Sequence, residues 1–140
     1  MIFPILGGKV GPSGTSTKTT ELVTLHPPLV SKGLTLPDNF ARHCSVLVKD
    51  QLFLIGGVET ESKVLSIKLS DLSMSYKSEL EQGRWNLACA KMIGLNLVPL
   101  IVVTGGRIGG NALTKTTEIY CTKHNAWKFG KLFESRIPQN

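Results

Sequence analysis

Apolar runs separated by short polar stretches recur along this chain at a constant interval. Three of these runs end in a pair of glycines, and the second glycines of the pairs are Gly8, Gly57 and Gly106. The interval from 8 to 57 and the interval from 57 to 106 are each 49 residues. A constant period of this size indicates a structural repeat, with units at about 1–36, 37–81 and 82–137.

Short runs of β-branched and leucine residues, bounded by glycine and polar turn residues, predict strands within each unit. No segment keeps a helical period over ten or more residues, and 70–82 is the one stretch with some helical character. Lys49 and Asp50 form a tight link between two β-rich runs. The predicted strands of the second and third units are 44–48, 51–55, 63–69, 74–78, 86–92, 100–104, 116–121 and 126–130. The chain therefore predicts an all-β fold of about 11 strands in three sheets.

The third unit resembles a kelch repeat, in which an apolar strand ends in two glycines and is followed by a strand ending in Tyr and then by Trp. Here these residues are Gly105, Gly106, Tyr120 and Trp127. The second unit has the glycines but places Ile67 or Leu69 where Tyr is expected and Tyr76 near the Trp position. The first unit has the glycines alone. The glycines of the first two units are Gly7, Gly8, Gly56 and Gly57.

The resemblance implies four-stranded antiparallel blades of an incomplete kelch-type β-propeller. The first unit has no strand ahead of its second one, and Pro138-Gln139-Asn140 resembles Pro37-Asp38-Asn39, which precedes a predicted strand. The chain thus corresponds to two full blades and part of a third. We expect open blade edges that favour self-association. A partial gene product without independent function is one interpretation.

The segment 102–112 also looks like the phosphate-binding loop of a short-chain dehydrogenase, in which a helix N-terminus holds a pyrophosphate. The residues that follow, "LTKTTEIYCT", predict a strand instead of a helix. Gly8 and Gly57 occupy the same place in their units without the extra glycines. We therefore expect no dinucleotide and no other cofactor.

The composition narrows the choice of partner. The chain has 140 residues, a net charge of +6 and no run of basic residues interleaved with aromatic ones, so we expect no nucleic-acid partner. No apolar stretch is long enough to span a membrane, and we expect no membrane partner. Three widely spaced cysteines lie in apolar stretches. We interpret them as reduced and buried, which, with the lack of a signal peptide, favours the cytoplasm.

Arg42 is the leading candidate for partner binding. In kelch propellers that capture peptides, an arginine ahead of a blade's first strand lies at the channel mouth, and Arg42 matches this position. Arg84 is offset by about three residues, and a surface arginine is the alternative for both. Arg107 and Asn111, in the loop after the third glycine pair, are further exposed candidates.

No metal-ligand spacing or nucleophile motif is present, so we expect a protein-binding scaffold or substrate-receptor fragment and not an enzyme. The alternative is a fragment of a kelch-like propeller enzyme, such as an oxidase or a sugar-processing enzyme.

Overall fold

The computed structural model describes residues 2–10 and 14–130, with the backbone alone at residues 2–6 and 10. The unit boundary at 137 and the segment Pro138–Asn140 lie outside the described residues. The described part is all-β, as predicted, and contains no α-helix. It therefore also lacks any helix able to cross a membrane.

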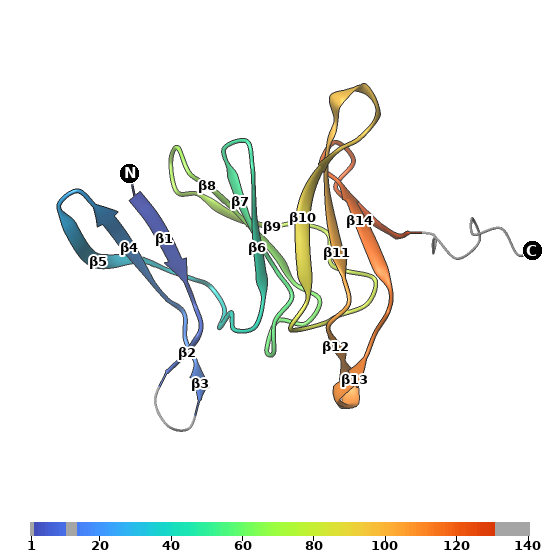
Figure 1. The fold of residues 1–140 in the computed structure, drawn as a ribbon, viewed down its shortest axis with the longest axis horizontal. Helices are drawn as coiled ribbons and strands as arrows, with labels where there is room; N and C mark the ends of the chain where they lie inside the picture. The colour runs from blue at the N-terminus through green and yellow to red at the C-terminus, as the bar shows by residue number, and fades with distance from the viewer. Residues whose placement is uncertain (1, 11–13, 131–140) are drawn as a thin grey trace, which may run out of the picture.

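Eleven strands form three antiparallel sheets that lie side by side in chain order (Figure 1). Sheet 1 has three strands in the order β1-β4-β5, and sheets 2 and 3 have four each, in the orders β6-β7-β8-β9 and β10-β11-β14-β15. The sheets stand in an open row and do not close into a ring. Their strands are β1 (Ile2–Leu6), β4 (Thr19–Leu25), β5 (Pro28–Thr35), β6 (Cys44–Val48), β7 (Gln51–Ile55), β8 (Val64–Lys68), β9 (Met74–Tyr76), β10 (Ala88–Ile93), β11 (Pro99–Thr104), β14 (Thr117–Cys121) and β15 (Ala126–Phe129).

Short elements complete the described chain. Two hairpins of two-residue strands follow the first and third glycine pairs, and two one-turn 3-10 segments interrupt unit 3. The segment 70–82 holds strand β9 and turns, so its helical character is not realised. The short elements are β2 (Lys9–Val10), β3 (Thr15–Ser16), β12 (Arg107–Ile108), β13 (Ala112–Leu113), η1 (Leu95–Leu97) and η2 (Gly109–Asn111).

Sheet 2 is buried on both faces because its strands alternate apolar side chains between two cores. Phe53 and Ile55 of β7 face a core shared with sheet 3, where Tyr120 and Trp127 lie. Leu54, between them, faces a second core shared with Leu36 and the segment that follows sheet 1. This double burial explains why "LFLI" is apolar at every position.

The glycine pairs end β1, β7 and β11, and all three strands run toward the same end of the sheets, here called the glycine end. The chain that leads into sheet 2 or into sheet 3 crosses close to each pair. A Cβ on Gly56 would lie 2.5 Å from the carbonyl oxygen of Arg84, and one on Gly106 would lie 2.5 Å from that of Trp85. Both glycines also have positive φ, so close approach and backbone conformation each require glycine.

Arg84 and Glu118 form an ion pair of 2.6 Å in which both side chains are 0% exposed. The interpretation of Arg84 as a surface arginine is therefore wrong. Its guanidinium also donates to the carbonyl oxygens of Gln82, Gly105 and Thr116 and to the Thr116 hydroxyl. Glu118 accepts bonds from the backbone N–H groups of Glu81 and Gln82. Because a buried charge must be compensated, this network holds the segment that enters sheet 3 against β14.

Cys44 and Cys89 are joined by a disulfide between the first strands of sheets 2 and 3, across 45 residues of sequence. The prediction that these two cysteines are reduced is therefore wrong. Only Cys121 is free among the described cysteines, and it is half-buried. The cytoplasmic assignment stays a prediction and loses one of its two arguments.

Replacing Arg84 by Leu should lower the free energy of unfolding by about 3–5 kcal/mol, because the Glu118 carboxylate would stay buried without its cation. Urea unfolding measures the change. Arg42→Leu, at an exposed arginine, is the control and should change stability by less than about 0.5 kcal/mol. Equal effects of the two substitutions would contradict a buried role for Arg84.

Alkylation in denaturant without reductant should label one thiol per chain, at Cys121, and reduction should raise the number to three. Cys44→Ser/Cys89→Ser should cost about 2–4 kcal/mol of stability, because the unfolded chain regains the freedom of a closed loop. Cys121→Ser is the control with the crosslink intact. Three reactive thiols before reduction would show that the pair is not bonded.

Candidate functional site

The segments that lead into sheets 2 and 3 lie at the glycine end and are fixed there by main-chain hydrogen bonds. The Gly8 N–H donates to the Phe40 carbonyl at 2.7 Å, and the Gly57 N–H donates to the Arg84 carbonyl at 3.0 Å. Each glycine turn therefore holds the segment that starts the following sheet, so the side chains on these segments have a rigid support.

Arg42 lies in the segment leading into sheet 2, with φ of 56° and an exposed side chain. Its carbonyl oxygen accepts the N–H of Asn86, the corresponding segment of sheet 3, at 2.8 Å. The described residues supply no hydrogen bond or ion pair to its guanidinium. Arg42 thus presents an uncompensated positive charge where sheets 2 and 3 begin.

Arg107 and Asn111 lie together beside this point. The Arg107 guanidinium donates to the carbonyl oxygen of Asn111 at 2.9 Å, across the short β12–β13 hairpin. The Arg107 backbone pairs with Trp85, next to Asn86, through bonds of 3.0 and 2.8 Å. Asn111 is exposed as expected, whereas Arg107 is half-buried and not fully exposed. These main-chain and side-chain bonds therefore bring the three candidate residues to the glycine end of sheets 2 and 3.

His43 follows Arg42, and its ring lies largely inside the protein, edge-on to Phe40 with centroids 5.7 Å apart. Its buried Nδ1 atom has no hydrogen-bond partner among the described residues. Burial lowers the pKa of His43 below its ordinary value of 6.5, because desolvation disfavours the imidazolium. His43 is therefore a neutral part of the support beneath Arg42.

Stability should fall as the pH drops below about 6.5. His43 is neutral in both states above that pH, and below it the unfolded chain binds a proton that the folded chain resists. His43→Gln should flatten this part of the profile when unfolding free energies are measured between pH 5 and 8. An equally steep pH profile in His43→Gln would show that other groups cause the loss of stability. The matched control is His124→Gln, at an exposed histidine.

Sequence reasoning missed a polar cluster on the same lead-in segment. The Tyr76 hydroxyl donates to the Asp38 carboxylate, and the Lys63 ammonium lies 2.9 Å from the same oxygen. The Tyr76 hydrogen bond and then Lys63 lower the pKa of Asp38, while burial and the Asp38 bond raise the pKa of Tyr76. Lys63 and Tyr76 lie 25 and 38 positions after Asp38 in the sequence, so no local motif predicts the cluster.

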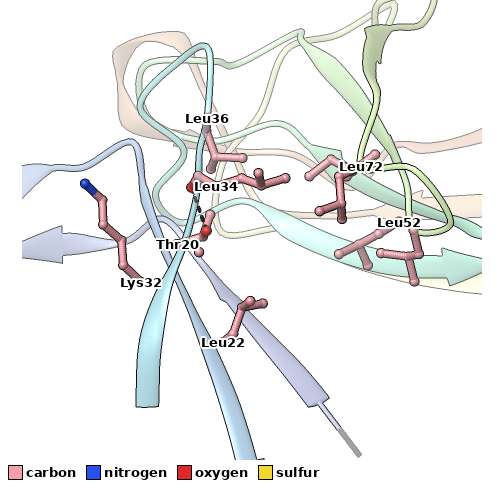
Figure 2. A pocket seen from close by; sticks show the side chains of 10 residues that line it. Thr20, Leu22, Lys32, Leu34, Leu36, Leu52 and Leu72 are labelled. Atoms are coloured by element: carbon pink, nitrogen blue, oxygen red, sulfur yellow. Dashed lines mark hydrogen bonds between the residues drawn. The ribbon is translucent and has the colours of Figure 1, made fainter.

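An apolar groove of about 500 Å³ separates sheet 1 from sheet 2. Leu22 and Leu34 line it from β4 and β5, and Leu52, Ile67 and Leu72 line it from the side of sheet 2. Figure 2 shows the leucines of the two sides facing each other across the gap. The groove lies outside the cluster around Arg42, and no sequence motif predicted it.

The comparisons with known proteins give a fold but no family. No family model and no curated protein matches the chain. A solved structure that it resembles is described as a novel fungal alcohol oxidase with catalytic diversity among the AA5 family, in complex with copper. The TM-score is 0.65 at 14% identity, over 91% of this chain and 27% of the oxidase chain. At this identity the likeness shows a shared fold alone.

The copper of that oxidase has no matching donor set in the part of the chain that the structure describes. Within residues 2–10 and 14–130, no three His, Cys, Asp or Glu side chains gather closely enough to hold a metal ion. The described residues therefore supply no such cluster for a copper ion.

Proposed function

We propose that this chain is a kelch-type protein-interaction module that binds an acidic partner at the glycine end of sheets 2 and 3. The observation that carries the proposal is the exposed side chain of Arg42, which has no partner among the described residues. Main-chain hydrogen bonds hold the segment on which it lies. Arginine suits this role because its planar guanidinium binds carboxylates with two parallel hydrogen bonds.

The charge of unit 3 favours an acidic partner. The only acidic residue between 85 and 130 is Glu118, which is buried and paired with Arg84. The basic residues of the same stretch are Lys91, Arg107, Lys115, Lys123 and Lys128. The surface formed by residues 85–130 is therefore positive, which raises the rate of encounter with acidic proteins and repels basic ones.

Arg42→Glu should weaken the affinity for such a partner by about 1–3 kcal/mol, because a charge-assisted hydrogen bond is lost and a like charge replaces it. Quantitative affinity capture with the full chain would identify proteins that the wild type retains, and calorimetry with the purified partner would measure the loss. Lys128→Glu makes the same charge change at an exposed site on the outer strand β15 and is the matched control. Equal losses of affinity in the two variants would show that net charge alone causes the effect. Unchanged affinity in Arg42→Glu would show that Arg42 is not part of the binding site.

The enzyme alternative has one observation in its favour, the fold shared with part of the alcohol oxidase. Copper binding by the full chain, measured by metal analysis after dialysis against Cu²⁺, separates the two proposals. A stoichiometric copper ion would favour a fragment of a propeller enzyme, and its absence would favour the interaction module.

A further inference from the structure

The groove between sheets 1 and 2 has a smaller counterpart between sheets 2 and 3, a pocket of about 200 Å³ whose lining includes Phe53 and Tyr120. Leu52 and Ile101 each stand four residues before the first glycine of their pair, so they are equivalent. Ile101 pairs with Tyr120, and Leu52 pairs with Ile67. Ile67 therefore occupies the position of Tyr120. In the same way Met74, which pairs with Ile67, occupies the position of Trp127, which pairs with Tyr120.

Two aromatic rings lie in the interface between sheets 2 and 3. Tyr120 and Trp127 lie with their centroids 4.9 Å apart, and Tyr120 lies 5.8 Å from Phe53 of sheet 2. Both are almost fully buried, at 1% and 6% exposure. On the other side of sheet 2 the same positions hold Ile67 and Met74, which have no rings. Ile67 lines the groove and Tyr120 lines its smaller counterpart, so the groove is widest where unit 2 lacks the Tyr120 ring.

Among the described residues, the side chains that line the groove are mostly apolar. Of its polar lining side chains, the Thr20 hydroxyl already donates to the Leu34 carbonyl at 2.6 Å, and the Lys32 ammonium points away from the leucines in Figure 2. A peptide would place its N–H and C=O groups there without partners, which is costly. A flat hydrocarbon surface carries no such cost, and apolar cavities in proteins bind small aromatic molecules.

We propose that this groove is a binding site for a small, uncharged aromatic molecule of about the size of indole. Its volume of about 500 Å³ lies within the range of small-molecule sites. The ligand would lie between Leu22 and Leu34 on one side and Leu52 and Ile67 on the other. It would supply there a ring that unit 2 lacks at the position of Tyr120.

Titration of the full chain with indole, followed by ¹H–¹⁵N NMR, tests this proposal. Saturable shifts are expected at the amides of groove residues such as Gly33 and Ile67, together with a higher melting temperature. The double substitution Ile67→Tyr/Met74→Trp installs the rings of the neighbouring interface and should weaken indole binding by about tenfold or more.

A second variant at the rim keeps the test independent of core repacking. Leu72 is half-exposed, so Leu72→Asp should leave the fold intact and weaken indole binding by placing a charge beside the groove. Leu113→Asp, at a leucine 74% exposed at the glycine end, is the matched control and should bind like the wild type. Indole binding that is absent in the wild type, or unchanged in Leu72→Asp, would overturn the proposal. Neither result bears on Arg42, which lies elsewhere.

Discussion

The buried pair of Arg84 and Glu118 is the interaction on which the arrangement of sheets 2 and 3 depends. Two charges without any contact to water need each other and a full set of hydrogen-bond partners, and the network supplies both. The hydrogen bonds of this network hold the chain from Glu81 to Arg84 against β14 and against the third glycine turn. The carbonyl oxygen of the same arginine accepts the Gly57 N–H, so sheet 2 is attached to this segment as well.

Much of the fold could be predicted from the sequence because its signals are local. Alternating apolar residues and the glycine pairs placed the strands of units 2 and 3 within one to two residues of their observed bounds, and β6 and β7 at the same bounds. The remaining errors concern partners that are distant in sequence. Arg84 and Glu118 are 34 residues apart, and Cys44 and Cys89 are 45 residues apart. Neither pairing can be predicted from the sequence before the arrangement of the neighbouring sheets is known.

The candidate site was predictable residue by residue but not as a unit. Arg42, Arg107 and Asn111 were each singled out in a loop, whereas their common place follows from backbone bonds of Asn86 and Trp85 that only the fold brings about. Ile67 and Met74 show a related difficulty. Strand pairing places Met74, not Tyr76, at the position of Trp127, because Ile67, not Leu69, takes the place of Tyr120.

Native-state hydrogen exchange tests the central role of the buried pair most directly. The amides of Glu81 and Gly57, which donate to Glu118 and to the Arg84 carbonyl, should exchange only when the whole of sheets 2 and 3 unfolds. Their opening free energies should then equal those of amides in the middle of β7 and β11. Exchange of Glu81 and Gly57 at the rate of exposed loop amides would contradict the account, because the segment would then open without disturbing the sheets.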